Sequence, residues 1–360
     1  MKILILANYD VGLFRFRKEL IAELLKNNTV FISLPYGELV EPLKSMGCIF
    51  IDTQFERRGI NPAEDFRLLR NYKKLLKEIK PDLVITYTIK PNVYGGFVCR
   101  MLKIPYAANI TGLGTAFQGK GLLRKLVTLM YKVGLKKVKT VFFENSENRQ
   151  IFIDEKIVKE EKTCLLNGAG VNLERFGVAE YPAENETTRF LFIGRVMKEK
   201  GIDELFKAMQ LLREDGIDCV LDVVGGFEED YTEMLKQYES EGWLNYHGYQ
   251  KDVRPYIANC HCFALPSWHE GMANTNLECA AMGRPVITTN IHGCLEAVED
   301  GVTGYLCEKQ NPESLYKVMK RFVELPYEHR RDMGLAGRKR MEEIFDKKKV
   351  VEKTIRGLVL

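Results

Sequence analysis

The chain has 360 residues, of which 46% are hydrophobic and 28% charged, and its formal net charge is +4. A domain usually has about 100–200 residues, so this length indicates two domains, and the composition excludes a disordered or collagen-like chain. No apolar run reaches the roughly 20 residues that a membrane-spanning helix needs. The opening residues MKILILANYD turn polar without a cleavage site, so we expect a first strand rather than an export signal.

Apolar, β-branched runs alternate with segments of helical spacing along both halves of the chain. In chain order the runs are KILILA, TVFISL, CIFID, DLVITY, PYAANI and TVFFE, then FLFIGR, CVLDVVG, LNYHG, CFALPS, PVITTN and TGYLCE. This alternation predicts βα units in two parallel sheets, an α/β fold. The polar residues 178–189 interrupt the pattern, so we place domains at 1–180 and 181–340. Residues 341–360 continue a helical pattern, and we expect them to cross back onto the first domain.

The N-terminal half is basic. Residues 1–175 contain 29 Lys and Arg against 18 Asp and Glu, a net +11, whereas the rest of the chain has a net −7. This asymmetry favours an anionic partner, either a membrane surface, a nucleic acid or a phosphorylated substrate. Residues 120–139 combine apolar positions at helical spacing with many Lys and Arg. They are expected either to dock on anionic lipid or to form a helix that packs on the sheet with a solvated basic face. No nucleic-acid-binding module is recognisable, so we expect no nucleic acid partner.

Nine cysteines are scattered along the chain without a repeated CxxC spacing. We interpret them as reduced thiols of a cytoplasmic protein. The trio Cys260, His261 and Cys262 suggests a metal site, but alternate residues of a strand point to opposite faces. We therefore predict a strand of the core there.

Two segments of the second half carry candidate chemistry. The run FLFIG leads into Gly194 and Arg195, and Lys200 and Gly201 precede the helical pattern IDELFKAMQLL. A glycine turn, two cations and a helix N-terminus suit a diphosphate, although a basic solvated loop explains the same pattern. Further along, Glu270 precedes the pattern TNLECAAMG. The free N–H groups at the start of that helix suit an anionic ligand.

Taken together, GR…KG, VVGG and E-x7-E followed by a Gly-Pro strand resemble the retaining, nucleotide-sugar-dependent glycosyltransferases of GT-B fold, family 4. The resemblance implies two doubly wound Rossmann-like domains facing across a cleft. The N-terminal motifs ANYDVGLFRFRKEL, TIKPNVYGG and NITGLGTAF are similar to a bacterial subgroup. That subgroup adds sugars to polyprenyl-diphosphate-linked intermediates of capsule, O-antigen or protein glycosylation.

The resemblance also implies roles for residues of the donor site. Arg195 and Lys200 bind the donor diphosphate, Glu278 binds the ribose hydroxyls, and Glu270 holds the transferred sugar. We expect Glu270, Arg195 and Lys200 to act in catalysis. The other implied donor contacts are Gly12, Gly194, Gly225, Tyr249, Gly271, Met272, Ala273 and Asn274.

The candidate acceptor site lies in the first domain. Arg15, Arg17 and Lys90 are candidates for the acceptor's diphosphate, with a structural role equally open for each, and Asn92 belongs to the same motif as Lys90. Some relatives have a His that touches the donor sugar at the strand that here reads Ala108-Asn109-Ile110-Thr111. This chain has none there, so Asn109 or Thr111 takes that place or the contact is not made. Thr111 is also an acceptor candidate.

The reaction that the family implies retains the configuration at the sugar. The acceptor hydroxyl arrives on the face that the diphosphate leaves, and a phosphate oxygen takes its proton. No DxD motif occurs in the chain. Two cations and a helix N-terminus are able to stabilise the leaving diphosphate, so we expect no cofactor and no metal requirement. UDP is the preferred nucleotide and GDP the second.

Two other enzyme classes stay open. A nucleotide-sugar epimerase of the same fold shares the donor site. An NAD-dependent oxidoreductase is suggested by Gly112-Leu113-Gly114, but Phe117 stands where the dinucleotide fingerprint needs its third glycine. The main interpretation is a hexosyltransferase, peripheral at the inner face of the cytoplasmic membrane. It takes a hexose or N-acetylhexosamine from a nucleotide-sugar donor and gives it to a lipid-linked saccharide acceptor.

Overall fold

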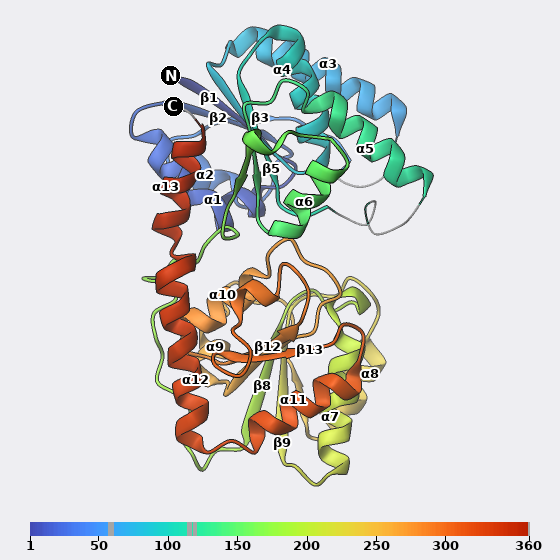
Figure 1. Ribbon diagram of the computed structural model, residues 1–360, viewed down its shortest axis with the longest axis vertical. Helices are drawn as coiled ribbons and strands as arrows, with labels where there is room; N and C mark the ends of the chain where they lie inside the picture. Colours follow the sequence, from blue (N-terminus) through green and yellow to red (C-terminus); the bar gives the residue numbers. More distant parts are fainter. Residues whose placement is uncertain (57–60, 114–116, 118–120, 359–360) are drawn as a thin grey trace. The chain divides into compact units, whose positions relative to one another are not determined.

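The computed structural model describes residues 1–56, 61–113, 117 and 121–358. It divides into an N-terminal unit, Met1–Ala169 with Lys347–Leu360, and a C-terminal unit, Gly170–Asp346 (Figure 1). The division comes before the predicted boundary at 180, because the polar residues 178–189 belong to the C-terminal unit. There the buried Arg284 guanidinium donates to the Ala179 and Glu180 carbonyls. Polarity in this segment therefore does not mark a linker.

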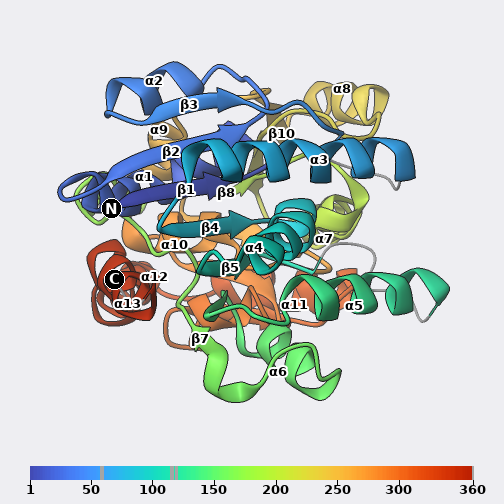
Figure 2. The same cartoon turned by 90° about the horizontal axis from the view of Figure 1, so that it is seen from above.

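The N-terminal unit contains a parallel sheet of seven strands in the order β3-β2-β1-β4-β5-β6-β7. Figure 2 shows the strands of this sheet side by side. Its strands are β1 (Lys2–Leu6), β2 (Thr29–Leu34), β3 (Ile49–Asp52), β4 (Leu83–Tyr87), β5 (Tyr106–Ile110), β6 (Thr140–Phe143) and β7 (Thr163–Leu165). The chain runs outward from β1 in both directions, so the order reverses between β1 and β4.

Helices cover both faces of this sheet, because alternate strand residues supply two separate apolar cores. Leu4 and Leu6 pack with α3, α4, α5 and α6, whereas Ile3 and Ile5 pack with α1, α2 and α13. Figure 1 shows the two groups on opposite sides of the strands. The helices are α1 (Asp10–Leu25), α2 (Val40–Ser45), α3 (Pro62–Ile79), α4 (Gly96–Leu102), α5 (Leu122–Gly134), α6 (Ser146–Asp154) and α13 (Lys347–Leu358).

The C-terminal unit repeats the same arrangement with six parallel strands in the order β10-β9-β8-β11-β12-β13. Its strands are β8 (Thr188–Ile193), β9 (Cys219–Val224), β10 (Leu244–Tyr246), β11 (Cys262–Leu265), β12 (Val286–Thr289) and β13 (Gly304–Cys307). Its helices are α7 (Ile202–Glu214), α8 (Thr232–Ser240), α9 (Arg254–Asn259), α10 (Asn274–Ala281), α11 (Pro312–Val323) and α12 (Tyr327–Arg340). The order reverses between β8 and β11, which places the switch point of this sheet at the ends of those two strands.

Several helices begin at the residues that local chemistry favours. Asn61 and Asn311 cap α3 and α11 with their side chains, and a proline follows each cap. Asn145 caps α6 by accepting from the backbone N–H of Asn148. An Asn cap satisfies one of the free N–H groups of the first turn, and proline suits the first helical position. These signals fix where the helices start relative to the strands that precede them.

The last helical segment is interrupted. After α12 a π-helical turn covers Met341–Phe345, and the helix breaks at Asp346 before α13 begins. The Val171 N–H donates to the Phe345 carbonyl within the C-terminal unit. Beyond the break, Val350 and Leu358 are buried against the N-terminal sheet, and the Thr140 hydroxyl donates to the Gly357 carbonyl at 2.7 Å. The chain thus returns to its first unit for the final helix.

Each of the apolar runs that predicted a strand contains one, and β7 is an additional edge strand. All nine cysteines lie within the described residues and none forms a disulfide. Cys260, His261 and Cys262 are buried at the start of β11, which confirms a core strand. Among the described residues, no helix is both long and apolar enough to cross a membrane.

Candidate active site

The candidate site of the C-terminal unit lies at its switch point. The loop after β8 carries Gly194 and Arg195, and the loop after β11 carries Glu270. In a doubly wound sheet, ligands bind outside the carboxyl ends of the strands at this point. The topology therefore brings together two sequence segments that lie seventy residues apart.

Glycines leave the backbone without side chains at the carboxyl ends of β8 and β9. Gly225 has φ +152°, and a Cβ there would lie 1.7 Å from the Gly194 carbonyl oxygen. The Gly194 N–H donates to the Val224 carbonyl at 3.0 Å, and the Gly225 N–H donates to the Gly248 carbonyl at 2.8 Å. Both predicted glycines thus lie at one point, where a ligand has access to the main chain.

Lys200 is positioned by a tight turn against the β11 loop. Residues Lys198–Lys200 form a 3-10 turn, and Gly201 follows with φ +73°. A Cβ on Gly201 would lie 2.0 Å from the Pro266 carbonyl oxygen, so no other residue fits here without movement of the backbone. This close approach places the start of α7 beside the segment that leads to Glu270.

Lys200 and Glu270 form an ion pair, and the Ser267 hydroxyl donates to the same carboxylate oxygen at 2.8 Å. The two paired side chains are 20% and 13% exposed. Gly293 backs the pair, because a Cβ there would lie 2.6 Å from the Glu270 carbonyl oxygen. The candidate diphosphate ligand and the candidate sugar ligand are therefore neighbours, held in partly buried surroundings that strengthen electrostatic interactions.

The N-terminus of α10 lies next to this pair along the chain. The Ala273 N–H donates to the Gly293 carbonyl at 2.7 Å, and no side chain of the described residues caps the helix. Met272 and Ala273 have buried side chains, so they offer a ligand only their backbone. The Asn274 Oδ1 atom is buried and accepts no hydrogen bond within the described part of the chain. Glu278 lies on the same helix, half-buried.

Arg195 and Tyr249 lie nearer to solvent. The Arg195 guanidinium is 3.1 Å from a Glu228 carboxylate oxygen, and its side chain is half exposed. Tyr249 is among the exposed aromatic residues. Gly271 is half-buried in the loop that precedes α10. An exposed ion pair contributes little stability, so Arg195 is available to exchange Glu228 for an anionic ligand.

Four residues beside the site were not predicted. His269 lies 3.3 Å from a Glu199 carboxylate oxygen, and the Trp268 indole donates to Glu204 at 3.0 Å. Burial lowers the pKa of His269, against the opposing effect of Glu199, and burial raises the pKa of Glu204. The dipeptide Trp268-His269 directly before Glu270 is a signal in the sequence, whereas nothing there indicates Glu199 as its partner.

In the N-terminal unit the structure corrects one acceptor candidate and alters another. Asn92 is fully buried in a π-helical turn, where it accepts from the Thr86 hydroxyl at 2.6 Å and donates to the Asn109 carbonyl at 2.9 Å. Its amide is thus committed to the core and does not face an acceptor. The Lys90 ammonium is 3.0 Å from Asp65, and both side chains are about one-tenth exposed. A structural role explains Lys90 without a ligand.

The remaining candidates of this unit differ in exposure. Asn109 is buried and donates to the Thr86 carbonyl at 3.2 Å, so it is not the substitute for the missing His. Thr111 is half-buried, and Arg15 is exposed on α1. Gly12 lies in the first turn of α1, and an added Cβ would meet nothing within 4 Å. The Gly112-Leu113-Gly114 motif lies partly outside the described residues.

Within the part of the chain that the structure describes, no group of three or more His, Cys, Asp or Glu side chains is arranged to hold a metal ion. The two predicted cations at the ends of β8 and β11, Arg195 and Lys200, each have a carboxylate partner. Such a set suits a phosphorylated ligand that carries a sugar.

Comparison with solved structures defines the class of fold. HepE from Anabaena, in a crystal structure with UDP and glucose, superimposes with a TM-score of 0.80 over 100% of this chain and 99% of that one, at 16% identity. Together with the two doubly wound units, this likeness shows a GT-B fold.

Sequence comparison then identifies the family. Residues 2–145 match the sequence model described as glycosyl transferase 4-like, and residues 178–340 match the one described as glycosyl transferases group 1. The two matches together show that the chain belongs to the family 4-like glycosyltransferases, as the motifs predicted.

Two curated relatives extend over most of the chain. One is the N,N'-diacetylbacillosaminyl-diphospho-undecaprenol alpha-1,3-N-acetylgalactosaminyltransferase of Campylobacter jejuni, 27% identical and matched over 90% of each chain. The other is the UDP-Gal:alpha-D-GlcNAc-diphosphoundecaprenol alpha-1,3-galactosyltransferase of Escherichia coli, 27% identical over 84% of this chain and 82% of that one.

Proposed function

We propose that this glycosyltransferase transfers a hexose or N-acetylhexosamine from a nucleotide-sugar, with UDP as the preferred nucleotide, to a polyprenyl-diphosphate-linked saccharide. The observation that carries the proposal is the Lys200–Glu270 pair at the β8–β11 switch point of a chain of this family. The names of the two curated relatives, which specify undecaprenyl-diphosphate-linked saccharides, support the class of acceptor.

In this proposal Lys200 and Arg195 hold the donor diphosphate, and Glu270 orients the sugar. A lysine ammonium has three donors, so Lys200 is able to keep Glu270 while it binds a phosphate oxygen. Glu278 accepts from the ribose hydroxyls, and the backbone at the start of α10 completes the phosphate site. The acceptor hydroxyl attacks from the face that the diphosphate leaves. The bond from the sugar to the diphosphate breaks, and a phosphate oxygen takes the hydroxyl proton.

We also propose that catalysis needs no metal ion. The charge to be stabilised is that of the departing nucleoside diphosphate, and two cations with a helix N-terminus supply fixed positive potential. Turnover is then expected to persist in EDTA. Loss of turnover in EDTA and its return with Mg²⁺ would show instead that a metal takes part.

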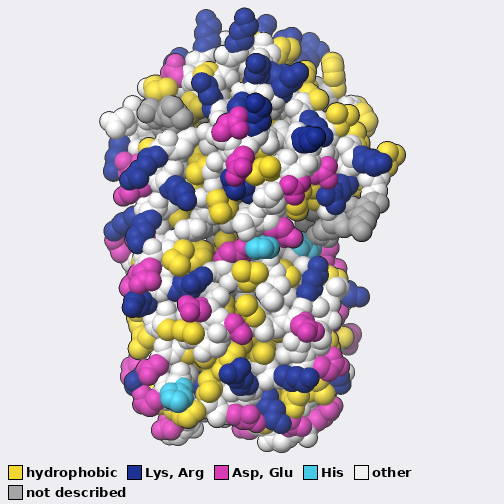
Figure 3. Space-filling view, viewed as in Figure 1, with side chains coloured by type: hydrophobic (Ala, Val, Ile, Leu, Met, Phe, Trp, Pro, Cys, Tyr) yellow, Lys and Arg dark blue, Asp and Glu magenta, His cyan; other side chains and the backbone are white. Residues whose placement is uncertain are grey.

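The basic N-terminal unit is proposed to bind the enzyme to an anionic membrane surface at the cytoplasmic face. Figure 3 shows Lys and Arg side chains over the visible face of this unit, with hydrophobic side chains among them. On α5, Leu122 is 84% exposed and Leu129 is 58% exposed. Exposed leucines between cations are typical of helices that lie in a membrane interface. Changing Arg124, Lys125, Lys136 and Lys137 to Glu is expected to abolish sedimentation with anionic vesicles.

Thermal unfolding with UDP, GDP, ADP and NAD in turn, without metal, tests the donor site. A ligand at 100 times its dissociation constant stabilises by roughly 2.7 kcal/mol. We expect a shift with UDP that is reduced in Arg195→Ala and Glu278→Ala. UDP-sugars are then screened with lipid-linked acceptors by mass spectrometry. A shift with NAD alone would contradict the proposal, and conversion of the donor without acceptor would favour the epimerase.

A further inference from the structure

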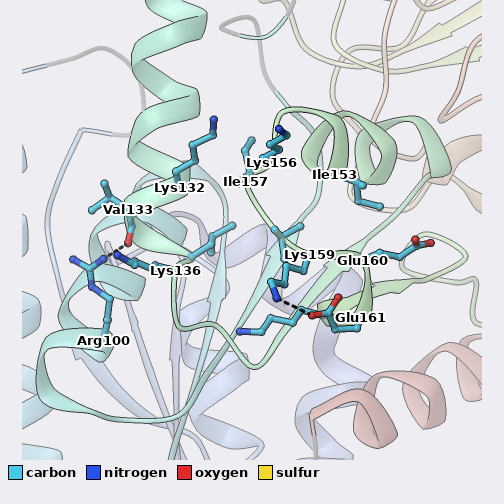
Figure 4. Close-up of a pocket in the computed structure, with 13 residues that line it drawn as sticks. Arg100, Lys132, Val133, Lys136, Ile153, Lys156, Ile157, Lys159, Glu160 and Glu161 are labelled. Atoms are coloured by element: carbon cyan, nitrogen blue, oxygen red, sulfur yellow. Dashed lines mark hydrogen bonds and ion pairs between the residues drawn. The ribbon is translucent and has the colours of Figure 1, made fainter.

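A basic pocket of about 970 Å³ lies in the N-terminal unit, and none of the residues that line it belongs to the candidate active site. Figure 4 shows the side chains that α4, α5 and the segment after α6 contribute to it. Six of them are cations and two are acids, so the pocket has a net positive charge. The cations are Arg100, Lys132, Lys136, Lys156, Lys159 and Lys162, and the acids are Glu160 and Glu161.

Three of these cations are available to a ligand. Within the described residues Lys132, Lys136 and Lys156 are exposed and have no acidic partner within 4.0 Å. Arg100 donates one N–H to the Val133 carbonyl at 3.0 Å, which leaves its other donors free (Figure 4). The pocket is therefore a site of uncompensated positive charge and not a network of ion pairs.

Apolar side chains line the pocket between the cations. Leu135, Ile157 and Val158 are buried, whereas Val133 and Ile153 are partly exposed. These five residues are the apolar floor of the pocket. A small hydrophilic anion has no apolar surface to bury, so an apolar floor would not contribute to its binding. The combination of apolar floor and cationic rim suits an amphiphile that carries phosphate and hydrocarbon in one molecule.

The pocket is continuous with an apolar ridge on α5. Leu122, Leu126, Leu129 and Val133 recur at helical spacing, and all are exposed. A second pocket of about 650 Å³ lies along this ridge, and Lys132 lines both pockets. An apolar surface that contacts the leucines of the ridge would therefore place its polar edge at the basic pocket.

We propose that this pocket binds the phosphate headgroup of an anionic phospholipid, while the α5 ridge enters the acyl region of the same leaflet. The inference deepens the proposed membrane association and rests on it. Charge complementarity selects the anionic lipid, and the apolar floor and ridge select a lipid over a soluble phosphate. The pocket thereby fixes which side of the N-terminal unit faces the bilayer.

The test is co-sedimentation with phosphatidylcholine vesicles that contain phosphatidylglycerol and no polyprenyl diphosphate. The pocket variant carries Lys132→Ala, Lys136→Ala and Lys156→Gly. Lys156 has φ +54°, a conformation that glycine adopts freely, so that change does not cost stability. The control variant carries the same number of charge changes on α3 of the same unit, at exposed positions. Its substitutions are Lys73→Ala, Lys74→Ala and Lys77→Ala.

We expect the pocket variant to lose about 100-fold in vesicle affinity, because each lysine near an anionic surface contributes about fivefold. The control variant is expected to lose less than about fivefold in vesicle affinity. Equal losses of vesicle affinity in the two variants would mean that the whole basic face is attracted to the vesicle, and would overturn the proposed headgroup site. Wild-type affinity in the pocket variant would overturn it as well.

Two further arms distinguish the source of the phosphate. Dihexanoylphosphatidate below its micellar concentration is expected to displace the enzyme from vesicles at far lower concentration than glycerol 3-phosphate. Equal potency would make the pocket a soluble-phosphate site. Binding that appears only after polyprenyl diphosphate is added would make it an acceptor site. Turnover on a water-soluble short-chain acceptor is measured in parallel, since its absence would contradict the proposed function and not the pocket.

Discussion

The two sheets have the same order over their first six strands, but the polar groups at their carboxyl ends differ in burial. In the N-terminal unit, Asn92 and Asn109 are buried, and Glu144 after β6 forms a buried ion pair with Arg17. In the C-terminal unit, Lys200 and Glu270 remain partly exposed at the corresponding edge. The same topology therefore serves as a rigid support in one unit and as a ligand site in the other. Removal of charge is expected to cost stability in the first and turnover in the second.

The largest effect is expected from Arg17→Met in the N-terminal unit. Burial raises the pKa of Glu144, and Arg17 is the main group that opposes this. Without Arg17 the carboxylate is buried without its partner, which costs about 3–5 kcal/mol of unfolding free energy. Because an acid with a raised pKa binds its proton more tightly in the folded state, the deficit is expected to shrink as the pH falls.

Urea unfolding of Arg17→Met at neutral and mildly acidic pH measures this loss. The double variant Arg17→Met, Glu144→Gln is the control, since it removes the unpaired charge and is expected to recover part of the stability. A single variant as stable as the wild type would mean that the pair is not structural and that the contrast between the units does not hold.

Gly201→Ala tests the close approach of the Lys200 turn to Pro266 in the C-terminal unit. The added Cβ would lie 2.0 Å from the Pro266 carbonyl oxygen, whereas at Gly216, with nearly the same φ of +75°, it would meet nothing within 4 Å. Gly216→Ala therefore bears only the left-handed backbone cost of about 1–2 kcal/mol. Gly201→Ala is expected to cost about 1–2 kcal/mol more and to lower turnover. Thermal unfolding of both variants gives the difference, and similar losses would show that the Lys200 turn yields easily.

Glu270→Gln and Lys200→Met test the partly buried Lys200–Glu270 pair directly. Each is expected to lower kcat about 10²–10³-fold, because a charge placed for the departing diphosphate and the sugar is lost. The unfolding free energy is expected to change by about 1 kcal/mol or less, as for a partly exposed pair. Steady-state kinetics and melting curves on the same samples measure both.

The double variant shows whether the two residues act together. Its loss of kcat is expected to be close to the larger single loss, since residues that act as a unit are not additive. Full turnover in Glu270→Gln with a native melting curve would remove Glu270 from the site.

The sequence predicted the strands because their apolar runs are long enough to be buried on both faces. It missed β7, which has three half-buried residues at the sheet edge and no pattern. It placed a linker at 178–189 because that segment is polar, but contacts with Arg284 hold it in the C-terminal unit. It also missed the break at Asp346, because no Gly or Pro interrupts the run MEEIFDKKK.

The candidate site divides in the same way. Glu270 and Lys200 were predicted because each stands in a recognisable motif. Their mutual pairing was not, since it depends on the approach of Gly201 to Pro266 across the sheet. Asn92 was taken for an acceptor ligand because it belongs to the same motif as Lys90, but its amide makes inward hydrogen bonds instead. The two cases differ only in where the side chain points, which needs the neighbouring strands to be in place.

The smallest effect is expected at the opposite end of β11 from the site. Burial lowers the pKa of His261 to about 4, and its Nδ1 accepts from the Arg189 N–H at 3.1 Å. The unfolded state binds the proton near pH 6.5, so between pH 6.5 and 5 the folded state loses about 2 kcal/mol as the pH falls. In His261→Asn, whose side-chain oxygen replaces Nδ1 as the acceptor, this part of the pH dependence is expected to disappear. The pH profile of kcat is expected to stay unchanged, because Glu270 and Lys200 lie beyond the carboxyl end of the strand. Denaturant unfolding and turnover across that range check both, and a kcat profile that moved with His261 would mean that the core of this unit and its site titrate together.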